Sequence, residues 1–156
     1  MKTADELWEL WHQARALPYG SAQIALVEQI LRHVDGAGDP RLAFVTRLLG
    51  TTAYIYGGEP AKAFVTFSWC VSDFDNNPSD YHQPLQHNLL WQFKAMANAL
   101  TRFPEVPLER TAAVLDDMER RYRESGHSLQ AVYKHRYLVA THVGRDDEAD
   151  QWFEKW

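Results

Sequence analysis

Two stretches of the sequence, 86 residues apart, carry related residues at one shared spacing. The first consists of Tyr54, Gly58, Ala63, Phe67 and Cys70, and the second consists of Ala140, Gly144, Ala149, Phe153 and Trp156. In both stretches successive residues are four, five, four and three positions apart. A glycine that ends one helix, a small residue where a second helix crosses it, and an aromatic residue beside that crossing account for this spacing. The spacing therefore predicts two copies of one helical hairpin.

Glycines, prolines and capping residues divide the rest of the chain into segments of helical length, in which apolar residues recur at intervals of three and four. Asp39 followed by Pro40 is a favourable helix start, because Asp accepts a free backbone N–H and Pro has none to satisfy. The expected helices cover approximately residues 4–16, 21–34, 41–56, 60–73, 85–103, 108–124, 128–143 and 146–156. The pattern predicts an all-α protein of about eight helices.

One segment conflicts with this pattern. Residues 65–71 alternate in the manner of a β-strand and contain β-branched and aromatic residues. No second strand-like run exists to pair with them, and a lone strand would leave its backbone donors and acceptors unpaired. We therefore expect a helix in this segment too.

The hairpin pattern resembles the tetratricopeptide repeat, in which an aromatic residue, a turn glycine, an alanine and a second aromatic residue follow in this order. The residues that carry the resemblance are Gly58, Ala63, Phe67, Gly144, Ala149 and Phe153. The 86-residue separation corresponds to two units of 43, which are longer than the family's repeat of about 34 residues, so the array is divergent. The resemblance implies antiparallel helical hairpins stacked as a short right-handed solenoid, with residues 1–156 as a single helical-repeat domain.

The last expected helix has aromatic residues on more than one side, at Trp152, Phe153 and Trp156. A terminal repeat normally has a polar outer face. Two hypotheses follow: the chain is the N-terminal part of a longer array, or this end contacts another chain, including by self-association.

Composition restricts the partners. The chain has 16 Lys and Arg against 21 Asp and Glu, a net charge of −5, which argues against a nucleic-acid surface. No apolar run approaches the ~20 residues that a membrane span needs. Cys70 is the single cysteine, and Asp5, Glu6 and Glu9 interrupt any secretory signal. These features predict a cytoplasmic protein that binds neither nucleic acid nor membrane.

The sequence offers no spacing for catalysis, a metal ion or a cofactor. His135 and His142 are two helical turns apart, roughly 10 Å, which is too far to share one metal ion. His82 and His87 fall on different sides of a helix. Cys70 occupies a small-residue position of the hairpin and is expected to be a buried apolar residue. We expect a protein that is not an enzyme and needs no cofactor.

A binding surface is the remaining possibility. Stacked hairpins form a concave face that is lined by the first helix of each pair and binds extended peptides or partner helices. The residues expected on this face are Arg47, Tyr54, Asn88, Trp91, Gln92, Lys94, Lys134 and His135. The face would be locally basic, so the predicted partner is a protein or peptide with an acidic or carboxylate-ended segment.

The alternative is a regulatory or sensor module whose helices enclose a small ligand or a peptide signal. A closed cavity lined by Trp91, Tyr54 and Met96 would favour this alternative, and an open trough would favour the interaction module.

Overall fold

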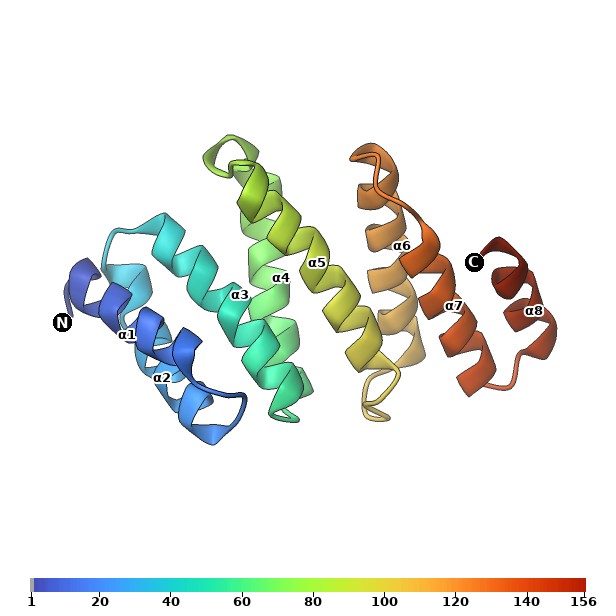
Figure 1. Ribbon diagram of the computed structural model, residues 1–156, viewed down its shortest axis with the longest axis horizontal. Coiled ribbons are helices and arrows are strands. Elements are labelled where there is room, and N and C mark those ends of the chain that lie inside the picture. Colours follow the sequence, from blue (N-terminus) through green and yellow to red (C-terminus); the bar gives the residue numbers. More distant parts are fainter. Residues whose placement is uncertain (1) are drawn as a thin grey trace. The chain divides into compact units, whose positions relative to one another are not determined.

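The computed structural model describes residues 2–156, which form eight α-helices and two short 3₁₀-helices and contain no strand (Figure 1). The elements are α1 (Ala4–Ala16), α2 (Ser21–Leu31), η1 (Val34–Gly36), α3 (Pro40–Tyr56), α4 (Pro60–Asn76), η2 (Pro78–Asp80), α5 (Gln83–Leu100), α6 (Leu108–Glu124), α7 (Gln130–His142) and α8 (Asp146–Lys155). The predicted all-α fold of eight helices is confirmed. None of these helices has both the length and the apolar character needed to cross a bilayer.

Local signals explain where the helices begin. The Thr3 hydroxyl accepts a hydrogen bond from the Glu6 backbone N–H, and the Glu6 carboxylate accepts one from the Thr3 backbone N–H, which is a reciprocal cap on α1. The Asp39 carboxylate accepts from the Leu42 backbone N–H at 2.9 Å, and Pro40 opens α3 as expected.

The strand-like segment lies in α4, as predicted. Ala63, Phe67 and Cys70 are buried, whereas Val65 is exposed. The buried positions are four and three residues apart, which is the period of a helix and not of a strand. Packing of this face decides the conformation against the local β preference.

Several helix ends differ from the predictions. The second helix ends at Leu31 and not near Val34, because η1 follows it. The fifth ends at Leu100, so Phe103 lies beyond it. The eighth begins at Asp146 as expected and ends at Lys155, one residue before the expected end.

The chain divides into two compact units, one ending at Gln92 and the other beginning at Phe93, so the boundary lies within α5. The single-domain prediction stays a prediction, since compact units also form within one repeat array.

In the first unit, α1 packs on α2 and α3, α2 packs on α3, and α3 packs on α4. The core of the first three helices consists of Leu7, Ala14, Val27, Ile30, Val34, Leu42 and Ala43. A second cluster consists of Phe44, Leu48, Cys70, Tyr81, Leu85 and Leu89, and it joins α3, α4 and the start of α5. The hydroxyls of Thr51 and Thr66 form a buried hydrogen bond of 2.8 Å between α3 and α4.

In the second unit, α6 packs on α7 and α7 packs on α8. Leu115, Met118, Tyr122, Val132 and Ala140 are buried there. The Arg136 guanidinium of α7 bridges Asp116 at 2.8 Å and Glu119 at 2.9 Å on α6.

The two stretches of shared spacing have the same backbone turn. Gly58 and Gly144 have φ values of +76° and +74°, in the left-handed region that favours glycine. The next residue donates its backbone N–H to the carbonyl five residues earlier, at 2.9 Å both from Glu59 to Tyr54 and from Arg145 to Ala140.

The side chains of the two stretches agree less well than the backbone. Ala63 and Ala149 are both buried. Phe67 is 4% exposed, as expected of an aromatic residue that fills the space beside a helix crossing. Phe153 is 60% exposed, so the same prediction is wrong at that position. The rings nearest to Phe153 are Tyr137 at 5.7 Å and Trp156 at 6.2 Å between centroids, and they leave much of it open.

Candidate functional site

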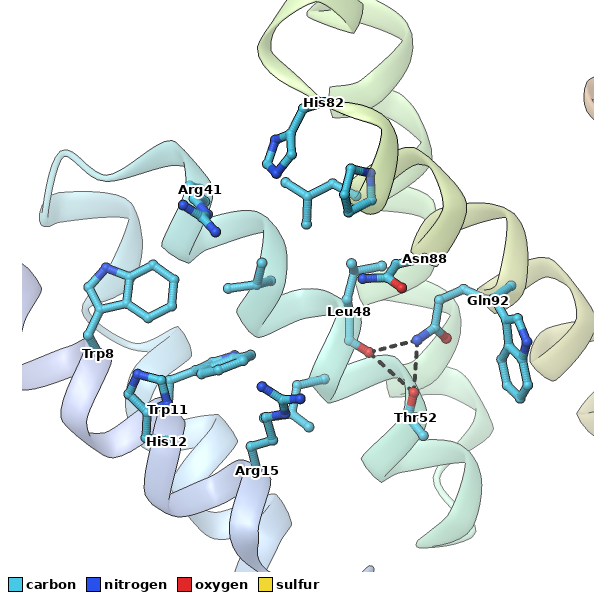
Figure 2. A pocket seen from close by; sticks show the side chains of 15 residues that line it. Trp8, Trp11, His12, Arg15, Arg41, Leu48, Thr52, His82, Asn88 and Gln92 are labelled. Atoms are coloured by element: carbon cyan, nitrogen blue, oxygen red, sulfur yellow. Dashed lines mark hydrogen bonds between the residues drawn. The ribbon is translucent and has the colours of Figure 1, made fainter. Parts of the chain in front are cut away.

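A groove of about 570 Å³ lies within the first unit (Figure 2). From α1 it is lined by Trp8, Trp11, His12 and Arg15, and from α3 by Arg41, Val45, Leu48, Leu49 and Thr52. The third wall consists of His82, just before α5, and of Pro84, Leu85, Asn88, Trp91 and Gln92 in α5. These residues follow one another at helical intervals of three and four along each helix, so each helix presents one face to the groove.

The aromatic wall is fixed by a long-range contact. The Trp8 indole Nε1 donates to Asp39 Oδ2 at 2.8 Å, while Oδ1 of the same carboxylate caps α3. Trp8 meets Trp11 edge to face, with ring centroids 5.5 Å apart. One side chain, Asp39, therefore both starts α3 and orients the tryptophan wall of α1.

The opposite wall is held by Gln92. Its Nε2 donates to the Leu48 carbonyl oxygen at 3.1 Å and to the Thr52 hydroxyl at 2.8 Å, which ties α5 to α3 (Figure 2). Asn88 and Trp91, one turn or less away on the same helix, are exposed, and Trp91 is 56% accessible. The wall thus has a fixed base and an open aromatic rim.

The groove is cationic in an otherwise acidic protein. Arg15 and Arg41 are exposed, and neither forms an ion pair with any residue in 2–156. The Arg15 guanidinium lies over the Trp11 ring, 5.4 Å from its centroid. No Asp or Glu of this part of the chain lines the groove. In Figure 2, Arg41 lies toward the end with Trp8 and His82, and Arg15 toward the end with Thr52.

The structure brings together three of the residues predicted to bind a partner: Asn88, Trp91 and Gln92. Lys94 and Lys134 belong to the second unit. Lys94 is half-buried with its ammonium 5.8 Å from the centre of the Tyr122 ring, and Lys134 is exposed, 5.8 Å from the centre of the Trp156 ring. Neither lines the groove.

Arg47 and Tyr54 were expected on the surface, but both are buried. The Arg47 guanidinium donates two hydrogen bonds to the Asp35 carboxylate, at 2.8 and 2.9 Å, and stacks over Trp69 at 3.9 Å. These contacts compensate the charge and the donors of Arg47 inside the unit. Arg47 and Tyr54 therefore offer nothing to a partner.

His135 is also buried, and the prediction that it adds charge to a surface is wrong. Burial, assisted by the charges of Lys134 and Lys94, lowers the pKa of His135 to about 4. The imidazole is therefore neutral at pH 7. Its Nδ1 has no hydrogen-bond partner within residues 2–156.

Sequence reasoning missed the α1 wall and Arg41. Trp8, Trp11 and Arg15 are three and four residues apart, so they share one side of α1, and this signal was present in the sequence. The residues expected to bind a partner included none from α1, and Trp8 and Trp11 also pack against the core cluster that contains Leu7.

The expectation for Cys70 holds as far as burial is concerned. Its side chain is inaccessible and its thiol lies 3.8 Å from the Phe44 carbonyl oxygen. Burial raises the pKa of this thiol well above its usual range, so the thiolate is disfavoured. Residues 2–156 contain no group of three or more His, Cys, Asp or Glu side chains placed to hold a metal ion.

Comparison with known proteins identifies no relative, since no family model, no curated protein and no solved structure matches this chain.

Proposed function

We propose that this protein is a non-enzymatic interaction module that holds a segment of a partner protein in the groove formed by α1, α3 and α5. The observation that carries the proposal is a groove of about 570 Å³ whose walls carry three tryptophans, two arginines without an ion pair in residues 2–156, and the exposed amide of Asn88. A volume of this size is also usual for small-molecule pockets, which span roughly 300–1,000 Å³, so the chemistry of the walls and not the volume favours a protein segment.

The chemistry of the walls suits a peptide. Trp8, Trp11 and Trp91 provide large flat surfaces, and tryptophan loses little conformational entropy when a ligand orders it. A bound chain also needs hydrogen-bond partners for its backbone N–H and C=O groups. Asn88, which is exposed and forms no side-chain hydrogen bond within residues 2–156, offers a donor and an acceptor on the rim.

We further propose the finer architecture, a divergent tetratricopeptide-like array of antiparallel hairpins. The shared turn at Gly58 and Gly144 and the buried Ala63 and Ala149 support this proposal. The groove adds support, because its walls come from the alternate helices α1, α3 and α5, the positions expected of the first helix in each pair. The turn by itself is weaker support, since Gly126 ends α6 in the same way.

The small-ligand alternative receives less support. A closed cavity lined by Trp91, Tyr54 and Met96 would have favoured it, but of these three residues only Trp91 lines the groove.

Selection from a random peptide library on the purified full chain tests the proposed function. We expect the selected peptides to bind wild-type protein and to lose at least about tenfold in affinity with Trp91→Ala, because Trp91 is an exposed aromatic contact of the groove. Trp156→Ala is the matched control, since Trp156 is 45% exposed and lies in the other unit. A selection that yields no binding peptide, or peptides that depend on Trp156 and not on Trp91, would contradict the proposal.

A further inference from the structure

The positions of the two groove arginines can be related through α1. The side chain of Trp8 in α1 reaches the start of α3, where its indole donates to Asp39 at 2.8 Å. Arg41 follows Asp39 by two residues. Arg15 is two helical turns beyond Trp8 on α1, which corresponds to roughly 10 Å along the helix axis. The two guanidinium groups are therefore attached near opposite ends of the groove, with Trp11 on the wall between them (Figure 2).

Neither of these arginines is paired with a carboxylate of the unit. Arg47, on the same helix as Arg41, differs from them, because its guanidinium donates two hydrogen bonds to the Asp35 carboxylate. Arg15 and Arg41 form no side-chain hydrogen bond or ion pair within residues 2–156. Asp5 and Glu9 of α1 line a neighbouring depression, which shares Trp8 and His12 with the groove.

The helix rise of roughly 10 Å separates the backbone positions of Trp8 and Arg15. An extended chain advances about 3.3 Å per residue and covers that distance in about three residues. We propose that the occupant of the groove is an extended protein segment with two acidic side chains about three residues apart and an apolar or aromatic residue between them. The carboxylates pair with Arg15 and Arg41, and the intervening side chain lies against Trp11. Asp5 and Glu9 repel such a segment from the neighbouring depression, which favours the groove. This inference rests on the proposed function, since it names the segment that the same groove takes.

Fluorescence anisotropy with short labelled peptides tests this inference. The first peptide is capped at both ends and carries two glutamates about three residues apart with a tyrosine between them, as the extended-chain spacing requires. A second peptide replaces both glutamates with glutamine, and a third has no glutamate but a free terminal carboxylate. We expect the first peptide to bind at least about tenfold more tightly than the other two, and to weaken as salt screens the charges.

Matched protein variants assign the charges. Arg15→Gln and Arg41→Gln should each weaken the first peptide by about three- to tenfold and leave the glutamine peptide unaffected. Arg32→Gln is the control, because Arg32 is an exposed arginine of the same unit that does not line the groove. A charge swap that combines Arg15→Glu and Arg41→Glu with a lysine-substituted peptide should restore binding, which a folding defect would not allow.

The outcomes separate this inference from the proposed function. If the glutamine peptide binds as well as the glutamate peptide and still depends on Trp91, the groove binds peptides but the acidic segment is wrong. If the free terminal carboxylate binds best, the two-acid spacing is overturned. If the glutamate peptide does not bind, or binds without dependence on Arg15 and Arg41, the inference fails. The proposed function fails as well only if the library selection yields no peptide that depends on Trp91.

Discussion

The α3–α4 pair and the α7–α8 pair share the same turn between their helices but differ in how far their second helix is buried. Both have a left-handed glycine in the turn, the same hydrogen bond from the following residue, and a buried alanine five residues after the glycine. The next two positions differ. Phe67 and Cys70 are buried in α4, whereas Phe153 and Trp156 are exposed at the end of the chain.

The difference separates what a turn determines from what neighbouring helices determine. Cys70 belongs to a cluster with residues of α3 and with Leu85 and Leu89 of α5, so a third helix contributes to covering α4. In the second unit, Phe153 and Trp156 contact each other and Tyr137 of α7. The turn and the small residue are thus properties of the local sequence, and burial of the later positions depends on a third element. The prediction that this end contacts further helices or another chain stays a prediction.

The largest test of this contrast is the removal of the two equivalent phenylalanines. Phe67→Ala should lower the free energy of unfolding by about 3–5 kcal/mol, because it creates a cavity in a packed interior. Phe153→Ala should lower it by less than about 1 kcal/mol, because that ring is mostly in water already. Urea unfolding followed by far-UV circular dichroism measures both values. Similar losses at the two positions would show that Phe153 is covered in solution, for example by self-association, which sedimentation at two concentrations would detect.

Acid should destabilise the second unit through His135. The pKa of His135 is about 4 when folded and close to 6.5 when unfolded, so the unfolded chain binds the proton more readily. Stability from the neutral imidazole is therefore fully present above about pH 6.5 and is lost as the pH falls toward 4, on the order of 2–3 kcal/mol in total.

Replacing His135 with glutamine should flatten this part of the pH profile. The equivalent position in α3, 86 residues earlier, is Leu49, which cannot titrate. Urea unfolding of wild type and His135→Gln at several pH values between 7 and 4 measures the difference. Parallel profiles for the two proteins would show that His135 is already solvated in the folded state.

The glycine turns should respond alike, in contrast to the phenylalanines. Gly58→Ala and Gly144→Ala should each cost about 1–2 kcal/mol, because a left-handed backbone strains any residue with a Cβ. A Cβ at either position meets no atom within 4 Å, so steric clash adds nothing. Gly126→Ala, in the similar turn after α6, is expected to match them. A much smaller loss at Gly144 than at Gly58 would mean that α8 detaches easily from α7.

Local signals were sufficient to predict most of the fold. Asp39 and Pro40 begin α3 and Gly58 ends it, because caps and left-handed turns depend on residues close in sequence. The candidate site was predicted only in part. Arg41 and Arg47 lie on the same helix, but only Arg47 is buried. Its hydrogen bond to Asp35 and its contact with the Trp69 ring come from other elements, so neighbouring sequence does not reveal them. Likewise, the Trp8 bond to Asp39 joins residues 31 positions apart and has no local signature.

The smallest expected effect concerns an ion pair that occurs at equivalent positions after both glycine turns, with the acidic and the basic residue in opposite order. Lys62 pairs with Glu59 at 2.6 Å at the start of α4, and Glu148 pairs with Arg145 at 3.4 Å at the equivalent positions of α8. An acid in the first turn of a helix also interacts favourably with the helix dipole, whereas a lysine there opposes it.

Glu148→Gln should therefore lower the free energy of unfolding by about 0.5 kcal/mol, since the pair and the dipole term are lost together. Lys62→Gln should produce no resolvable change, because the lost pair is offset by relief from the dipole. Thermal unfolding at low salt and in about 1 M NaCl measures both variants, and the high salt should erase the Glu148 effect. A larger loss for Lys62→Gln than for Glu148→Gln would reverse this ranking. It would show that the second bond of Lys62, to Glu28 of α2 at 2.7 Å, holds α4 to α2 more strongly than an exposed pair normally does.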